Sequence, residues 1–536
     1  MIANLATGVI LIAFVRLVVL LVRSLRGSEG VRSLKGPRTS SRLLGYEYDL
    51  SRQEDVGGLE SQWVREYGPT WRISGAFATD VLMTADPKAL QHIFHKSAYN
   101  YGKQASQNHM GYIMSGPNIV WADGEVYHRH RKIMNPAFST AQLRSFLLLF
   151  QAVGHKLSEK WKAELASHKE VEVFVNRWLS RAALDIIGAA AFDYDYKAMD
   201  EADESALAKA YHGIFKDVNF RLSKAELILR ASWDYLPFPI LKLFAYVPAR
   251  TFNHVRYVKN LYMTYGKQIL GEKRSEVDAE KRAGEKDVVT ILVKANESSD
   301  EKTRLNEEEI LAQMYTLTLA GHETTATTLT FLLYELAKNP EYQARMRQEI
   351  REARTRVLAR GDIDFTMEDL DGMTLCLNAI KETLRMHPVV TQIQRVAMKD
   401  DVLPLAHPIV TDGGQIVTAV PVRKGQVVNA SLAMYNRQVM QLPAMTIKAL
   451  TYSVTGFPRM SFSAGTRACL GWRFAVMEMQ VLVAELVGTF RFDLPAELES
   501  GMFEVLRGPA GNTMFPFVRG KVEHDGAVTL RVALAS

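Results

Sequence analysis

The chain of 536 residues contains little cysteine, and Cys376 and Cys469 are its only two thiols. Two thiols cannot build a disulfide framework, which excludes the small disulfide-stabilised secreted classes and indicates a reducing compartment. After about residue 40 the sequence also lacks Pro-, Gly- or Ser-rich linkers, internal repeats and low-complexity tracts. The excess of positive charge is small: the net charge is +6, and the charged residues are spread along the chain. These absences favour one large domain and give no support to nucleic-acid binding.

The N-terminal segment 1–22 is almost entirely apolar. As a helix it would be about 33 Å long, close to the hydrocarbon thickness of a bilayer. Arg16 interrupts it, so this side chain would have to reach the membrane interface. No small-residue cleavage pattern follows, and we predict an uncleaved transmembrane anchor rather than a signal peptide or a helix lying on the membrane surface. Residues 23–40 are basic and contain a Gly-Pro pair, which predicts a hinge, and the positive-inside rule then places 41–536 in the cytosol.

The apolar residues repeat with a helical period through most of the chain up to about residue 390, so helices are expected to dominate. The longest such pattern runs from Asn306 to Lys338, where Asn306 and Glu309 fit an N-terminal cap and Asn339-Pro340 stops the helix. Short strands are expected at 67–73 and 80–83, which combine turn residues with β-formers.

One cysteine lies in a segment bounded by glycines, Phe462-Ser-Ala-Gly-Thr-Arg-Ala-Cys-Leu-Gly471, which leads into an amphipathic helix. Gly465 and Gly471 allow positive φ or a close approach of the backbone to a flat cofactor. Arg467 supplies a permanent cation for an acidic group. The helix points its free N–H groups and the positive end of its dipole toward Cys469, which favours a thiolate. Cys469 is therefore a candidate metal ligand, and its sulfur suits iron.

This segment resembles the haem-binding loop of the cytochrome P450 family, whose pattern F-x-x-G-x-R-x-C-x-G has all five fixed positions filled. A lone cysteine is more often a small core residue than a ligand, and that interpretation is kept for Cys376. The resemblance implies that Cys469 is the axial ligand of a haem iron and that the other motif residues bind the cofactor. It also implies the mostly α P450 fold with a small β region. Haem b would lie between the long central helix and the loop. The other motif residues are Phe462, Gly465, Arg467 and Gly471.

The middle of the long helix contains Ala320-Gly-His-Glu-Thr-Thr325, and seven threonines between Thr316 and Thr330 are poor choices for a helix. The segment resembles the oxygen-activation motif of the same family. The resemblance implies that the small Ala320 admits dioxygen and substrate, while Glu323 and Thr324 deliver protons. The alternative for Thr324 is a hydroxyl that bonds back to the carbonyl four residues earlier.

Tyr127 and Arg131 are four residues apart and share a helix face in the stretch 121–136, which is rich in cations and aromatics. This stretch resembles the family helix whose W-x-x-x-R pair binds a haem propionate, with Tyr127 in the aromatic position. For His128, Arg129 and His130 the alternative is a solvated basic face that helps to dock a reductase. A further propionate ligand is expected at Arg395.

Glu382 and Arg385, in Lys-Glu-Thr-Leu-Arg, resemble the E-x-x-R helix of the family, where the pair is buried and structural rather than catalytic. Here the resemblance breaks, because residues 437–460 match neither the length nor the P-x-R-F/W pattern of the loop that supplies a third member. Arg437 and Arg459 are possible replacements. The departure is either real, with weaker haem retention, or a coding sequence lost at a splice junction.

The resemblance covers the chain from residue 37 to about residue 520, and its style is that of fungal membrane-bound enzymes of secondary metabolism. It implies an endoplasmic-reticulum monooxygenase that takes electrons from NADPH through a P450 reductase. The enzyme would insert one oxygen atom of O2 into a lipophilic substrate such as a terpenoid. Two alternatives remain: a haem-thiolate isomerase or dehydratase, which needs no external electrons, and a haem-poor pseudoenzyme. Substrate choice is expected to depend on variable loops such as residues 100–118.

Overall fold

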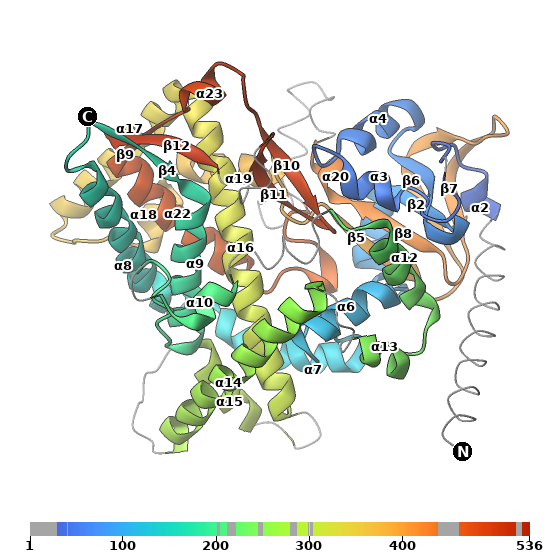
Figure 1. The fold of residues 1–536 in the computed structure, drawn as a ribbon, viewed down its shortest axis with the longest axis horizontal. Coiled ribbons are helices and arrows are strands. Elements are labelled where there is room, and N and C mark those ends of the chain that lie inside the picture. The colour runs from blue at the N-terminus through green and yellow to red at the C-terminus, as the bar shows by residue number, and fades with distance from the viewer. Residues whose placement is uncertain are drawn as a thin grey trace.

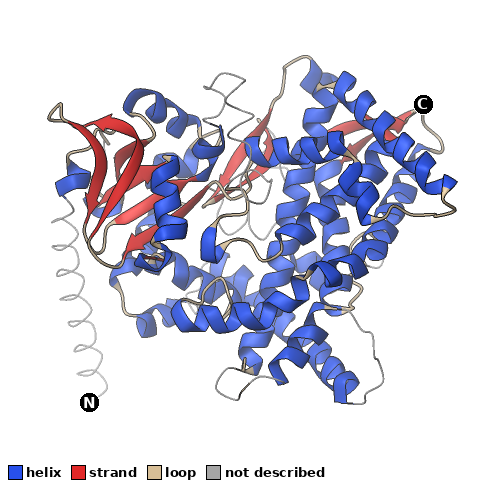
Figure 2. Ribbon diagram, turned by 180° about the vertical axis from the view of Figure 1, so that it is seen from behind, coloured by secondary structure: helices blue, strands red, loops and turns tan. Residues whose placement is uncertain are grey.

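The computed structural model places most strands at one end of the molecule and most helices at the other, with one long helix between them (Figures 1 and 2). It describes residues 29–39, 41–200, 204–211, 221–244, 250–278, 287–297, 300, 304–437, 460–520 and 528–535. The predicted anchor, residues 1–22, lies outside this set, as do residues 438–459. Within these ranges, no helix is both long enough and apolar enough to cross a bilayer.

The helices pack around α16, which Figure 1 shows running through the centre of the molecule with α8, α9 and α22 on one side of it. Their apolar faces form the largest hydrophobic core cluster. In chain order the described helices are α2 (Glu29–Arg32), α3 (Glu47–Arg52), α4 (Gly58–Tyr67), α5 (Pro87–Gln91), α6 (Ala105–Ser115), α7 (Gly124–Met134), α8 (Thr140–Leu165), α9 (Val175–Phe192), α10 (Ala206–Tyr211), α12 (Lys224–Ser232), α13 (Phe238–Phe244), α14 (Arg250–Asp278), α15 (Val288–Glu297), α16 (Glu307–Lys338), α17 (Pro340–Ala359), α18 (Met367–Gly372), α19 (Thr374–Met386), α20 (Leu432–Arg437), α22 (Trp472–Thr489) and α23 (Ala496–Glu499).

The main sheet has the strand order β1-β2-β8-β5-β3, in which β2 and β8 pair in parallel with Val81 opposite Val427. Three smaller sheets have the orders β4-β12-β9, β6-β7 and β10-β11, and their pairs are antiparallel. The strands are β1 (Thr70–Ser74), β2 (Asp80–Thr84), β3 (Tyr101–Gly102), β4 (Glu170–Phe174), β5 (Gln392–Ala397), β6 (Asp401–Val410), β7 (Ile416–Val422), β8 (Val427–Ser431), β9 (Phe490–Asp493), β10 (Val505–Ala510), β11 (Thr513–Val518) and β12 (Thr529–Leu534).

The elements with strong local sequence patterns lie where they were predicted. Helix α16 begins after Asn306, whose side chain accepts a hydrogen bond from Glu309 N at 2.8 Å, while Asn306 N donates one to Glu309 Oε2 at 2.9 Å. These reciprocal bonds satisfy N–H groups that the first helical turn leaves without a partner. The predicted strands correspond to β1 and β2. The mainly α fold with a small β region is confirmed.

A buried carboxyl group lies between α16 and α22. Glu478, on α22, is 1% exposed, and its Oε2 accepts a hydrogen bond from Thr325 Oγ1 at 3.3 Å. Its Oε1 has no partner among the described residues. Burial raises the pKa of Glu478 well above its ordinary value, although the Thr325 hydroxyl acts in the opposite direction. The folded protein therefore keeps a proton on Glu478 at pH values where the unfolded chain has lost it.

Glu478→Gln is expected to become more stable relative to the unchanged protein as pH rises. Above about pH 4.5 only the unfolded chain releases the Glu478 proton. The free energy of unfolding of the unchanged protein therefore falls by up to about 1.4 kcal/mol for each unit of rising pH. Glutamine does not titrate. Urea denaturation of both proteins between about pH 5 and about pH 8 measures the difference, which should widen with pH. A difference that stays constant would show that Glu478 is ionised in the folded protein.

Candidate functional site

The loop that carries Cys469 is closed by its own backbone immediately before α22. Cys469 N donates a hydrogen bond to Phe462 O at 2.8 Å, and residues Gly465–Arg467 form a short 3-10 turn between them. Gly465 has φ +67°, and a Cβ atom at this position would lie 1.8 Å from Phe94 O. The predicted need for glycine is therefore real here, because the loop packs directly on the backbone at residue 94.

For Gly471 the first of the two predicted reasons for glycine, a positive φ, does not apply, and the second, a close approach to a cofactor, stays a prediction. Gly471 has φ −90°, which other residues adopt readily, and an added Cβ would meet only Phe138 Cε1 at 3.6 Å. It lies at the N-cap of α22, where the backbone turns into the helix without left-handed geometry. Any requirement for glycine at this position must come from something other than the polypeptide.

The Cys469 side chain is exposed, although protein atoms surround the thiol closely. Burial within the fold raises its pKa, while the Gly471 N–H and the charge of Arg131 act in the opposite direction. The N-terminal end of α22 therefore acts on the thiol in the predicted direction, through the Gly471 N–H at its N-cap, and the thiolate itself stays a prediction. A bound metal ion would deprotonate the thiol outright. Cys376 is buried, as predicted, and 1% exposed.

The centre of α16 faces the same region. Thr325 is hydrogen-bonded to Glu478, which lies less than two turns from the end of α22 next to Cys469. Ala320 is exposed in the middle of this otherwise buried helix, and Thr324 and Glu323 are half-buried. Thr324 Oγ1 donates to Ala320 O at 2.8 Å, so the alternative geometry considered for this hydroxyl is the one observed. The hydroxyl oxygen can still accept a hydrogen bond.

Helix α7 brings the predicted Tyr127–Arg131 pair to the Cys469 loop. Arg131 Nη1 donates to Tyr127 Oη at 2.8 Å and to Ala468 O at 2.7 Å, and Tyr127 Oη donates to Thr466 O at 2.9 Å. The two side chains therefore act as a unit that ties α7 to the residues on either side of Arg467. Sequence spacing correctly placed them on one face.

The side chains around the Cys469 loop carry more positive than negative charge. Arg467 forms an ion pair with Asp123, but its Nη1 is buried without a hydrogen-bond partner among the described residues. Burial and the charge of Arg467 lower the pKa of Arg395, on β5, to about 10. Burial, Arg467 and Arg395 lower the pKa of Lys103 to about 7. Asp123 acts in the opposite direction on both. The side chains of Arg467, Arg395 and Lys103 thus share one carboxylate, Asp123, which makes the cluster suited to an anionic group.

Lys103 and Asp123 were not predicted as site residues. Asp123 precedes α7 and accepts a hydrogen bond from Gly124 N at 2.9 Å, so its helix-capping position could have been recognised from the sequence. Its pairing with Arg467, 344 residues away, has no local sequence pattern. Lys103 lies in an irregular segment whose position depends on the tertiary fold.

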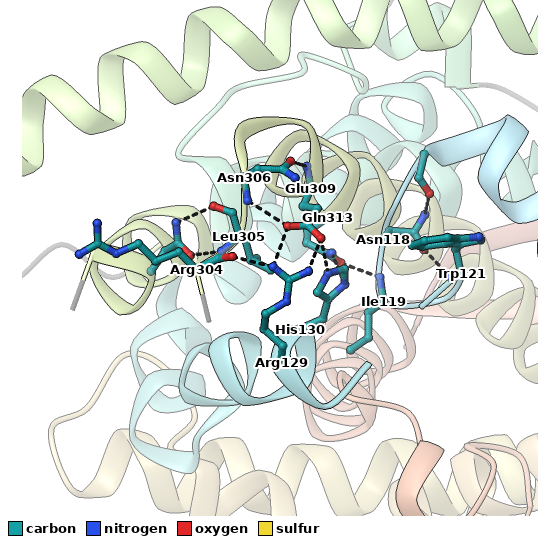
Figure 3. Close-up of polar contacts among 12 residues, drawn as sticks. Asn118, Ile119, Trp121, Arg129, His130, Arg304, Leu305, Asn306, Glu309 and Gln313 are labelled. Carbon is teal, nitrogen blue, oxygen red and sulfur yellow. Dashed lines mark hydrogen bonds and ion pairs between the residues drawn. The ribbon is translucent and has the colours of Figure 1, made fainter. Parts of the chain in front are cut away.

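Figure 3 shows how α7 is fixed to the start of α16. His130 Nε2 lies 3.1 Å from Glu309 Oε1, and Gln313 Nε2 donates to His130 Nδ1 at 3.0 Å. Because Nδ1 accepts, Nε2 carries the hydrogen and donates to Glu309. Arg129 forms two contacts with the same carboxylate. The predicted alternative of a solvated basic face is wrong for His130, which is fully buried, and for Arg129, which is paired.

Glu309→Gln is expected to lower the free energy of unfolding by about 3 kcal/mol, because Arg129 loses its buried anionic partner. The pKa of Glu309 is lowered, since hydrogen bonds from Asn306, His130 and Arg129 outweigh its burial, so the carboxylate is charged in the fold. The exposed neighbouring residue supplies the control: Glu308→Gln should change stability by less than about 0.5 kcal/mol. Equal denaturation midpoints for the two variants would mean that apolar packing alone joins α7 to α16.

The Glu382–Arg385 pair is formed, with Arg385 Nε donating to Glu382 Oε2 at 2.8 Å. However, Glu382 is 62% exposed, which corrects the expectation of a buried pair. The reason is that Glu382 borders a groove of about 860 Å³ between α16, α19 and β10. Arg437 does not replace the missing third member, since it donates to the carbonyls of Met386 and Val56. Arg459 lies outside the described residues.

Comparison with known proteins identifies relatives of this chain. The family model described as Cytochrome P450 matches residues 38–417 and 451–509, and the interruption overlaps the segment where the family pattern fails. Cytochrome P450 monooxygenase 128 of Postia placenta is 30% identical over 94% of this chain and 92% of its own length. Cytochrome P450 monooxygenase claQ of Ampulloclitocybe clavipes is 29% identical over 86% of each protein. Ganoderic acid synthetase CYP5150L8 of Ganoderma lucidum is 30% identical over 80% of this chain and 82% of its own.

Proposed function

Because this chain belongs to the cytochrome P450 family of oxidoreductases, we propose that it is a haem-thiolate monooxygenase that inserts one oxygen atom of O2 into a lipophilic small molecule. One observation supports this most directly. The loop that presents the accessible Cys469 thiol is bonded to α7 through Arg131 and lies beside a cation cluster with a buried, unpartnered guanidinium nitrogen. That combination offers one soft ligand for a metal and several donors for carboxylates.

The family implies a haem cofactor, and the residues present fit one. The propionates of a haem would neutralise the cation cluster and give Arg467 Nη1 the acceptor that it lacks among the described residues. Ala320, exposed in the middle of α16, leaves room beside the helix. We therefore propose that haem b is held by Cys469 as axial ligand and by neighbouring groups. The residues proposed for cofactor binding are Phe462, Gly465, Arg467, Gly471, Tyr127, Arg131, Arg395, Ala320 and Lys103.

Haem, when bound through a thiolate, supplies the iron chemistry that activates dioxygen. The polypeptide has to hold the thiolate, exclude water and move protons. Arg131 holds Ala468 O next to the ligand and places a positive charge near the sulfur. Thr324 and Glu323 are the proposed catalytic pair: the hydroxyl accepts and passes a proton, and the partly exposed carboxyl group exchanges with solvent.

Electrons are proposed to come from NADPH through a cytochrome P450 reductase. The relatives named above come from Postia placenta, Ampulloclitocybe clavipes and Ganoderma lucidum, and the one from Ganoderma lucidum is named a ganoderic acid synthetase. We accordingly propose an apolar secondary metabolite, such as a terpenoid, as substrate. Residues 1–22 would anchor the protein in the endoplasmic-reticulum membrane, with residues 41–536 as the cytosolic catalytic domain.

The reduced, carbon-monoxide-bound difference spectrum of the purified protein tests this proposal first. A Soret band at the long-wavelength position of thiolate ligation supports it, and product formation that requires both O2 and NADPH with a reductase completes the test. A haem-thiolate isomerase would show the same band but turn over without electrons. A pseudoenzyme would lack the band.

Thr324→Ala is expected to uncouple the reaction without loss of haem. The hydroxyl is half-buried and bonded only to its own helix turn among the described residues, so its removal should leave the fold and the carbon-monoxide spectrum unchanged. Product formed per NADPH should fall at least about tenfold, because proton delivery is lost. Hydrogen peroxide release should rise correspondingly. As a control, Thr330→Ala removes a hydroxyl with the same back-bonding but 0% exposure, and should keep wild-type coupling.

A further inference from the structure

A single turn of π-helix carries the backbone on which the Cys469 loop packs. Residues His92–Lys96 form this π-turn directly after α5. Its central residue, Phe94, is 3% exposed, and a Cβ atom added at Gly465 would lie 1.8 Å from Phe94 O. The two backbones therefore touch without an intervening side chain. Turns of this kind are rare and are found mostly at functional sites, and here the position of the π-turn decides where the Cys469 loop can lie.

The π-turn also contacts the cation cluster beside the loop. Arg395 Cζ lies 5.6 Å from the centre of the Phe94 ring, close enough for a cation–π interaction. Phe94 belongs to the same hydrophobic core cluster as Met460, and Ala464 packs against that cluster. A shift of the π-turn would therefore move the support of the Cys469 loop together with one of the side chains proposed to bind the cofactor.

The segment that leads into the π-turn is held by a buried carboxylate. Asp86 is 0% exposed and accepts hydrogen bonds from Lys88 N at 2.9 Å and from Ala89 N at 3.1 Å, at the start of α5. The same carboxylate accepts two more from Ala406 N and His407 N of β6, each at 2.9 Å. Helix capping accounts for the first two bonds, and the other two attach α5 to β6.

The π-turn itself is attached to the beginning of β6. His92 Nε2 lies 2.9 Å from Asp401 Oδ2, and Tyr101 Oη donates to the same oxygen at 3.1 Å. Burial raises the pKa of Asp401, but the hydrogen bonds from His92, Val402 and Tyr101 lower it more, so the group is a carboxylate. Because a carboxylate only accepts, His92 Nε2 carries a hydrogen and donates it.

We propose that His92 is a positioning residue, whose hydrogen bond to Asp401 holds the π-turn where it supports the Cys469 loop for ligation of iron. The inference rests on the proposed haem-thiolate function and deepens it. Strand β6 fixes the α5 segment through Asp86 and the π-turn through Asp401, so the support has two separate attachments. The attachment at His92 is only two residues from Phe94, and its loss should release the loop while α5 stays in place.

His92→Phe tests this role against a merely structural one. Phenylalanine keeps a ring beside Tyr101, whose ring centre lies 6.2 Å from that of His92, but it cannot donate to Asp401. In the reduced carbon-monoxide spectrum, the ratio of the long-wavelength Soret band to the band of an unligated or protonated thiol should fall about tenfold or more, because a hydrogen bond to a charged group is lost. His92→Gln offers an amide donor and should restore most of the ratio.

Tyr101→Phe is the matched control. It removes a hydrogen bond to the same oxygen of Asp401, but from β3 rather than from the π-turn. Both phenylalanine variants should lose similar stability in urea, whereas the Soret ratio should change by less than about twofold in Tyr101→Phe. Equal losses of the ratio in the two variants, or no recovery in His92→Gln, would overturn the proposal.

The second measurement needs no haem. Cys469 N donates to Phe462 O and closes the loop, so hydrogen exchange at this amide reports how often the loop opens. In the cofactor-free protein, exchange should be about tenfold faster in His92→Phe than in Tyr101→Phe. Equal exchange rates would contradict the proposal. Absence of the long-wavelength Soret band in the unchanged protein would count against the monooxygenase function instead, and the exchange comparison would still decide whether the π-turn holds the loop.

Discussion

Cys469→Ser is expected to abolish the long-wavelength Soret band of the reduced carbon-monoxide complex and all reductase-supported turnover. Serine has nearly the same shape, but its hydroxyl is a far weaker and harder ligand than a thiolate, so the electronic character of the site is lost. Because Cys469 is exposed and closes the loop through its backbone N–H, which serine keeps, the fold should survive the change. Thermal unfolding in the absence of haem should therefore be within about 1 kcal/mol of the unchanged protein.

The second cysteine provides the matched control. Cys376, on α19, is 1% exposed, and its pKa is raised by burial and by Glu349. Cys376→Ala should cost stability by a small cavity, about 1 kcal/mol, and leave the spectrum intact. A thiolate-type band that persisted in Cys469→Ser would assign the iron ligand to another residue and remove the basis of the proposed function.

Gly465→Ala is expected to be among the most damaging single substitutions in the chain. Alanine at φ +67° costs about 1–3 kcal/mol, and its Cβ would in addition lie 1.8 Å from Phe94 O. That oxygen belongs to the backbone of the turn His92–Lys96, which cannot rotate away as a side chain can. We expect a loss of about 4 kcal/mol or more in the free energy of unfolding, with displacement of the Cys469 loop.

Gly471→Ala is the informative comparison, because its backbone angles suit alanine and the nearest atom is 3.6 Å away. The cofactor-free protein should tolerate this change in denaturation experiments. A loss of haem binding with unchanged stability would show that the space beside Gly471 is reserved for the cofactor. If Gly465→Ala were as stable as Gly471→Ala, the loop would not pack on residue 94 as described.

The predictions that succeeded were those carried by short-range patterns. Helix α16 and its capping pair, the start of α22 and the Tyr127–Arg131 face all depend on residues within a few positions of one another. The hydrogen-bonding needs of helix ends and the helical repeat act locally, so a sequence displays them directly.

The predictions that failed depend on burial and on distant partners. Lys103 and Asp123 join Arg467 only because the fold brings these segments together. Glu382 was expected to be buried, and it faces a groove instead. Each of these outcomes is decided by what surrounds a side chain rather than by its neighbours in sequence.

The parallel pairing of β2 with β8 also bears on how the protein is made. Val81 pairs with Val427, so one edge of β2 stays unpaired until a strand about 350 residues later has been synthesised. At about 5–20 residues per second this delay lasts roughly 20–70 s, during which the apolar β1–β2 hairpin presents an open edge. Fragments that end before residue 427 should accordingly aggregate or bind chaperones, and slower translation should lengthen the vulnerable interval. The main sheet is therefore completed late in synthesis, although its first two strands are made early.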